Sequence, residues 1–197
     1  MKKMALVLVA LIVILPSSLW ADDAVTLGGY SNYTNGSWTL GFEFTPTVNI
    51  NVTALGSYFQ AGVTSGHDVG LWDTSGNLLA STTVVGSGAG SDGFQYAAIS
   101  PMTLLAGTSY VVGGETLSDN YALDYTHSFI VGPGITYDGH VETYGASLAY
   151  PGLGIITYFD DFGGNFQYTP TPEPGSMMLL GSGLFGLAGI VRRKMAR

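Results

Sequence analysis

The sequence contains no cysteine. That absence excludes a disulfide-stabilised mini-protein, a cysteine-ligated zinc or iron–sulfur site and a cysteine nucleophile. Lysine and arginine are also absent between Asp22 and Thr171, because all six basic residues lie at the two ends of the chain. All fourteen acidic residues lie between Asp22 and Glu173. A body of this charge repels phosphate backbones, so the sequence argues against nucleic-acid binding and against an arginine clamp for a substrate phosphate.

The first 21 residues have the layout of a secretory signal peptide. Two lysines precede an apolar run from Met4 to Leu15, and small or polar residues follow before the acidic Asp22. The run is shorter than the about 20 residues that a membrane-spanning helix needs. We therefore predict that residues 1–21 are removed by signal peptidase after Ala21. The alternative is an uncleaved N-terminal anchor.

The last 27 residues contain three features in a fixed order. A short motif comes first, an apolar run from Met177 to Val191 follows, and a basic cluster ends the chain. As a helix, the apolar run would cover about 22 Å, which is marginal against a hydrocarbon core of about 30 Å. Basic residues favour the cytoplasmic side, so the body would face outward. The motif is Pro172, Glu173 and Pro174, and the basic residues are Arg192, Arg193, Lys194 and Arg197.

This tail, residues 171–197, resembles the PEP-CTERM sorting signal. The resemblance implies an exported protein of a Gram-negative bacterium that also makes extracellular polysaccharide. It implies recognition by exosortase, with cleavage near the Pro-Glu-Pro motif after transient anchoring in the inner membrane by the C-terminal transmembrane helix. The mature protein would then lie at the cell surface or outside the cell. The alternative is an ordinary C-terminal anchor.

The body, residues 22–170, shows the period-2 alternation of apolar and polar residues that is typical of half-buried antiparallel strands. Clear examples are Trp38–Phe44 and Val48–Val52, and a glycine turn at Gly76 predicts a hairpin. Further strands are predicted at 94–99, 102–105, 108–112 and 163–168, and strands joined by long loops between Tyr121 and Pro151. The predicted fold is all-β: a single antiparallel β-sandwich or jelly-roll-like domain.

A second resemblance supports this fold. The segments Gly70–Ala80, Gly93–Gln95 and Leu105–Val112 look like a β-sandwich domain of unknown function found in secreted bacterial proteins. The match covers roughly residues 38–113. Its motifs are structural, so it implies the fold and says little about activity.

The sequence offers no convincing catalytic site. His67, His127 and His140 are the only histidines, they form no metal-binding pair, and we expect them at the surface. The adjacent carboxylates Asp160 and Asp161 would point to opposite faces of a strand, which does not suit the paired acids of a glycosidase. We predict that the protein is not an enzyme, with a secreted hydrolase as the less favoured reading.

Two kinds of binding site remain. Calcium takes six to eight oxygen ligands. There are two candidate ligand loops, one with Asp160 and Asp161 and the other with Asp119, Asn120 and Asp124; the alternative is that these acids only solubilise the surface. A sugar site would use aromatic rings in polar surroundings, and the candidates are Tyr121, Tyr125 and Tyr144. The two body tryptophans, Trp38 and Trp72, are expected in the core.

These observations together predict a non-catalytic structural or binding module at the cell surface or in the extracellular matrix, associated with exopolysaccharide. The alternative is a carbohydrate-binding or calcium-dependent adhesion module. Signal peptidase and exosortase are the predicted processing partners, and extracellular polysaccharide is the candidate ligand. Apart from calcium, no cofactor is predicted.

Overall fold

The computed structural model of the protein describes residues 21–152, 154–156, 158–171 and 183. Nearly all of the predicted signal peptide and of the sorting tail therefore lies outside the described residues, including the Pro-Glu-Pro motif and the basic cluster. Within the described part, no helix has the length and hydropathy needed to cross a membrane.

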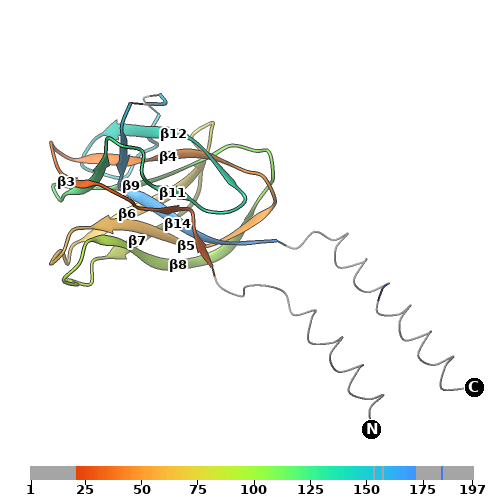
Figure 1. Cartoon of the computed structure of the whole chain (residues 1–197), viewed down its shortest axis with the longest axis horizontal. Coiled ribbons are helices and arrows are strands. Elements are labelled where there is room, and N and C mark those ends of the chain that lie inside the picture. The colour runs from red at the N-terminus through yellow and green to blue at the C-terminus, as the bar shows by residue number, and fades with distance from the viewer. Residues whose placement is uncertain (1–20, 153, 157, 172–182, 184–197) are drawn as a thin grey trace, which may run out of the picture.

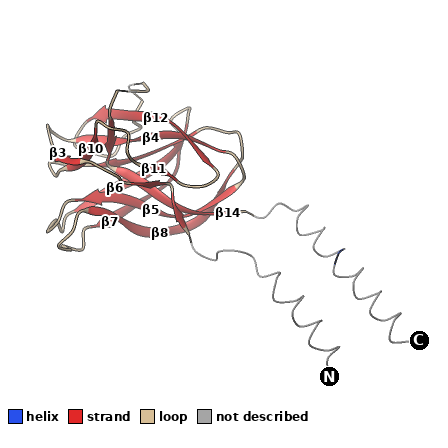
Figure 2. Cartoon of the chain, in the orientation of Figure 1, coloured by secondary structure: helices blue, strands red, loops and turns tan. Residues whose placement is uncertain are grey.

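Two large antiparallel sheets form the body (Figures 1 and 2). The strand order of the first is β12-β4-β9-β6-β7 and that of the second is β1-β14-β5-β8. The strands of the first are β12 (Ile135–Tyr144), β4 (Trp38–Pro46), β9 (Tyr110–Glu115), β6 (Gly66–Asp73) and β7 (Leu78–Val85). Those of the second are β1 (Asp22–Asp23), β14 (Gly164–Pro170), β5 (Ile50–Phe59) and β8 (Gly93–Leu104).

Two small antiparallel sheets complete the fold. One has the order β13-β10-β3 and the other pairs β11 with β2. Their strands are β13 (Asp160–Phe162), β10 (Tyr121–Asp124), β3 (Ser31–Tyr33), β11 (Ile130–Val131) and β2 (Val25–Thr26). The predicted all-β sandwich is thereby confirmed, and the region after Tyr121 consists of strands joined by loops.

The alternation pattern located most of the large strands. The hairpin of β6 and β7 turns at Gly76, whose φ of +82° lies in the region that glycine adopts without steric cost. One prediction was wrong in detail: the two segments expected at 94–99 and 102–105 form one strand, β8. The pairing register with β5 shifts between Val52 and Ala54, and this bulge absorbs Pro101, which cannot donate to a sheet ladder.

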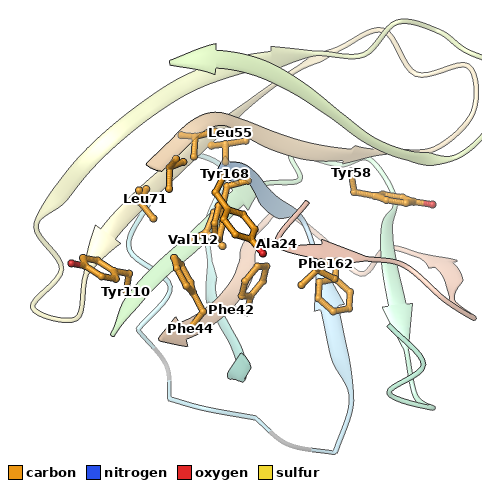
Figure 3. Close-up of a cluster of buried hydrophobic side chains, with 14 of the residues drawn as sticks. Ala24, Phe42, Phe44, Leu55, Tyr58, Leu71, Tyr110, Val112, Phe162 and Tyr168 are labelled. Carbon is orange, nitrogen blue, oxygen red and sulfur yellow. The ribbon is translucent and has the colours of Figure 1, made fainter. Parts of the chain in front are cut away.

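The core between the two large sheets is rich in aromatic side chains. Phe42 and Phe44 on β4 face Phe166 on β14, with ring centroids of Phe44 and Phe166 4.6 Å apart. Phe162 of β13 packs against Phe42 from the side, as Figure 3 shows. All four phenylalanines are fully buried. The sheets are thus joined through a continuous aromatic cluster of the kind that dominates core energetics.

Next to this cluster, the two sheets approach so closely that only glycine fits. A Cβ atom on Gly164 of β14 would lie 2.5 Å from the backbone nitrogen of Gly114 and 2.6 Å from the carbonyl carbon of Gly113, both on β9. A Cβ on Gly114 would in turn lie 2.9 Å from the carbonyl oxygen of Gly163. These glycines set the local spacing of the sandwich.

Candidate functional site

A small open pocket of about 200 Å³ lies where one end of the β12–β4 pair meets the sheet β13-β10-β3. Its volume is below the roughly 300–1,000 Å³ of typical small-molecule sites, so it has room for a small ligand or for one unit of a longer one. The pocket combines aromatic rings, one amide and two carboxyl groups. It is lined by Tyr33, Asn35, Trp38, Tyr121, Leu123, Tyr125, Glu142, Phe159 and Asp161.

The aromatic side chains of the pocket support one another in edge-to-face pairs. The ring centroids of Tyr33 and Tyr121 are 5.7 Å apart, and those of Tyr125 and Phe159 are 6.2 Å apart. Tyr125 is 68% exposed and offers most of its ring to solvent, whereas Tyr121 is buried at 2%. Tyr121 therefore lies at the floor of the pocket and Tyr125 at its rim.

Asn35 holds two of these rings in place. Its side-chain oxygen accepts hydrogen bonds from the indole nitrogen of Trp38 at 2.7 Å and from the Tyr121 hydroxyl at 3.1 Å. Both bonds use Oδ1, so the amide NH₂ group stays available to donate to a ligand.

The carboxyl groups come from two different strands. Glu142 lies on β12, two residues after His140, so both side chains project from the same face of that strand. Asp161 lies on β13 opposite Leu123 of β10. One ligand atom from each of His140, Glu142 and Asp161 falls within 4.8 Å of the others, and His140 Nε2 is 3.9 Å from Glu142 Oε2.

Burial is the largest cause of the pKa shifts of His140, Glu142 and Asp161. It raises the pKa of Asp161 to about 8, with the charges of Glu142 and Asp160 adding to the shift. It also raises the pKa of Glu142 and lowers that of His140 to about 4. Both ring nitrogens of His140 and Oδ1 of Asp161 are buried and find no hydrogen-bond partner among the residues that the structure describes.

The predicted sugar-stacking tyrosines lie in one region. Tyr121 and Tyr125 line the pocket, and Tyr144, 69% exposed, packs edge-to-face on the pocket residue Trp38 with centroids 5.0 Å apart. The expectation that Trp38 belongs to the core is correct only in part, because Trp38 packs against the buried cluster of Leu40, Tyr121 and Leu123 but is half-buried at the pocket end of β4. Trp72 is buried as predicted.

The aspartates of the two candidate calcium loops make different contacts within the fold. The Asp119 carboxylate accepts a hydrogen bond from Ser65 and contacts His67. Asp160 contacts His127 and accepts a hydrogen bond from Tyr137. As the strand pattern predicted, Asp161 points the other way from Asp160, into the pocket. A calcium site remains a prediction.

Asp124, the fourth of these aspartates, organises the loop that follows β10. Its carboxylate accepts hydrogen bonds from the backbone and hydroxyl of Thr126 and from the backbone and hydroxyl of Ser128, at 2.7 to 3.1 Å. Burial alone would raise the pKa of Asp124, but these hydrogen bonds outweigh it and hold the pKa below its usual value.

Replacing Asp124 by alanine is expected to lower the free energy of unfolding by about 1.5–3 kcal/mol at pH 7, because the hydrogen bonds from Thr126 and Ser128 to a charged acceptor are lost. Since the folded-state pKa is depressed, this stabilisation is present above the unfolded pKa of about 3.9 and is lost as the pH falls below it. Urea denaturation at pH 7 and at pH 3 measures both effects. Asp22→Ala is the control, and equal effects of the two substitutions would contradict the assignment.

Two of the three histidines are buried, not at the surface as the sequence suggested. His140 is fully buried, and His67 is 1% exposed; only His127 is substantially accessible. His67 bridges Ser57 Oγ at 3.1 Å and Asp119 Oδ2 at 3.0 Å. Ser57 is completely buried, so the hydroxyl of this serine–histidine–aspartate arrangement is not exposed at the surface.

Sequence reasoning missed five of the pocket residues as well as the buried His140. Asn35, Leu123, Glu142 and Phe159 gave no sign of a binding site in the sequence, and Trp38 was assigned to the core. The one local signal was the spacing of His140 and Glu142, which places two potential ligands on the same face of a strand.

Comparison with known protein families gives two matches. Residues 170–194 match the PEP-CTERM protein-sorting motif, which includes the predicted Pro-Glu-Pro segment. The chain is therefore an exported protein with an exosortase sorting signal. No curated protein matches the chain significantly. Residues 25–157, most of the body and most of the pocket, match the model described as domain of unknown function DUF4082. The chain accordingly belongs to the DUF4082 family and carries a PEP-CTERM sorting signal.

Proposed function

We propose that the body is a non-catalytic carbohydrate-binding module that attaches the exported protein to extracellular polysaccharide. The observation that carries this proposal is the pocket, in which exposed aromatic rings stand beside amide and carboxyl groups. Aromatic rings stack on the apolar faces of sugars, and groups such as the Asn35 amide and the Glu142 carboxyl hydrogen-bond to hydroxyls.

The charge of the body narrows the ligand class. The pocket contains two acidic residues, and the body contains no lysine or arginine. An acidic polysaccharide would meet the negative charge of the body without a lysine or arginine to pair with it, and like-charge contacts disfavour a partner. The proposal therefore specifies a neutral polysaccharide, of which the pocket holds a single unit.

The test is a binding screen with neutral glucans, galactans and mannans, and with a polyuronate as the acidic comparison. Binding to at least one neutral polysaccharide and none to the polyuronate is expected. Tyr125→Ala should weaken that binding roughly 2- to 13-fold, because an aromatic contact contributes about 0.5–1.5 kcal/mol. Leu105→Ala is the control: Leu105 is 56% exposed and lies near Pro46, at the end of β4 away from Trp38.

Absence of binding to every neutral polysaccharide would contradict the proposal, as would equal effects of the two substitutions. Preferred binding of the polyuronate would contradict the ligand class.

A second candidate, a glycoside hydrolase, is favoured by the two carboxyl groups. Glycosidases place a pair of carboxyls on either side of the scissile bond, with the acid held protonated, and the pKa of Asp161 is raised to about 8. However, Asp161 is only 5% exposed, which leaves little space for a glycosidic bond between it and Glu142. Release of reducing ends from the bound polysaccharide, abolished by Glu142→Gln, would establish the hydrolase instead.

A further inference from the structure

The cluster of His140, Glu142 and Asp161 contains buried polar atoms that the fold does not satisfy. His140 is fully buried, and neither ring nitrogen has a hydrogen-bond partner among the described residues. Asp161 Oδ1 is also buried and has no hydrogen-bond partner among the described residues. Buried polar groups are nearly always paired, so each exception requires an explanation. Three such atoms in one cluster point to a group that binds there.

The three side chains are held by different parts of the fold. His140 and Glu142 lie on β12, which is paired with β4 along its length, and the backbone carbonyl of His140 accepts a hydrogen bond from Ile156. Asp161 is held by the pairing of β13 with β10. The ring of His140 also packs against that of Phe159, with centroids 5.4 Å apart. The arrangement is therefore set by backbone pairing and packing, which pre-organises the potential ligands.

The donor set is that of a metal site. From these contacts we infer that His140, Glu142 and Asp161 bind a divalent transition metal of the zinc class at the wall of the pocket. Zinc is held by histidine nitrogen and carboxylate oxygen at about 2.0–2.2 Å, which in a tetrahedral site places ligand atoms roughly 3.3–3.6 Å apart. His140 Nε2 and Glu142 Oε2 are 3.9 Å apart, and all three ligand atoms lie within 4.8 Å of one another, so small side-chain movements would complete the site.

The imidazole distinguishes this site from a calcium site. Calcium takes six to eight oxygen ligands, whereas imidazole suits zinc and its neighbours in the transition series. Three protein ligands leave a fourth tetrahedral position. Glu142 and Asp161 line the pocket, so that position is open to a water molecule or to an oxygen of a ligand in the pocket.

The test is a calorimetric titration of the full chain with ZnCl₂, after treatment with EDTA and dialysis and without any carbohydrate. One Zn²⁺ per chain is expected. Glu142→Gln and Asp161→Asn should each weaken binding by more than the roughly 10–100-fold that follows loss of an outer-shell partner. The matched control is Asp119→Asn, which makes the same change beside His67 and should leave zinc affinity unchanged.

Replacement by Co²⁺ supplies a second measurement, because its visible absorption reports four-coordinate binding. The band should be present in the wild-type protein and in Asp119→Asn and absent from Glu142→Gln. Glu142 is only half-buried, so this variant keeps the test decisive if Asp161→Asn does not fold. No zinc binding, or binding that Asp119→Asn abolishes and Glu142→Gln does not, would overturn the inference. The zinc titration contains no carbohydrate, so its failure would leave the proposal of polysaccharide binding standing, and that proposal is tested separately by the polysaccharide screen.

Discussion

Replacing Phe42 by alanine is expected to lower the free energy of unfolding by about 3–5 kcal/mol, the range for truncating a fully buried phenylalanine. The Phe42 ring lies against those of Phe44, Tyr137, Phe162 and Phe166, at centroid distances of 5.5 to 6.3 Å. The ring therefore joins β4 to β12 in its own sheet, to β13 in a small sheet and to β14 in the second large sheet. Alanine would leave a cavity at their junction.

Chemical denaturation followed by tyrosine and tryptophan fluorescence measures this loss. Leu105→Ala serves as the control, because Leu105 is exposed and its truncation should change the free energy of unfolding by less than about 0.5 kcal/mol. A loss below about 2 kcal/mol for Phe42→Ala would mean that the cluster collapses around the missing ring, and that the aromatic junction is less important than its geometry indicates.

The second large loss of stability is expected when a single methyl group is added at Gly164, by the substitution Gly164→Ala. The new Cβ would lie 2.5 Å from Gly114 N and 2.6 Å from the carbonyl carbon of Gly113. Both are backbone atoms of β9, so relief requires the two sheets to separate. We expect Gly164→Ala to destabilise the protein at or above the upper end of the roughly 1–3 kcal/mol range for overpacking, or to prevent folding.

Gly90→Ala is a matched control for this prediction. A Cβ on Gly90 meets nothing within 4 Å, and its φ lies outside the positive range, so the substitution should be neutral or slightly stabilising. Thermal unfolding of both variants by circular dichroism provides the comparison. Equal melting temperatures for the two variants would show that the sheets move apart at little cost.

The sequence predicted the fold best where the signal for an element lies within that element's own residues. Alternation of apolar and polar residue types marked β4, although the structure buries or half-buries every position of that strand. The turn at Gly76 marked the β6–β7 hairpin. Both features are local in the chain. The continuous strand β8 was split at Pro101, since proline normally ends a strand. Its accommodation depends on a bulge opposite Val52 and Ala54, and that pairing is not visible in a local pattern.

The pocket depends even more on distant pairing. Its residues range from Tyr33 to Asp161 and come from β3, β4, β10, β12 and β13 and from the loops beside them, which hold Asn35, Tyr125 and Phe159. The tyrosine candidates were found because their neighbours in the chain are polar. His140 was assigned to the surface because a lone histidine in a glycine-rich segment gives no sign of the Phe159 ring that covers it. Only the order of the sheets brings Glu142 next to Asp161.

The direction of β4 has a consequence for how the protein presents its pocket. Trp38, at the first residue of β4, lines the pocket, while Pro46 ends the strand at the opposite end of the body. Thr171, the residue at which the described body ends, donates its backbone N–H to Asn49, three residues beyond Pro46. The chain thus leaves the body at the end opposite the pocket (Figure 1). A body tethered through its C-terminus would hold its pocket outward, so that neighbouring copies could crowd side by side on one surface without covering one another's pockets.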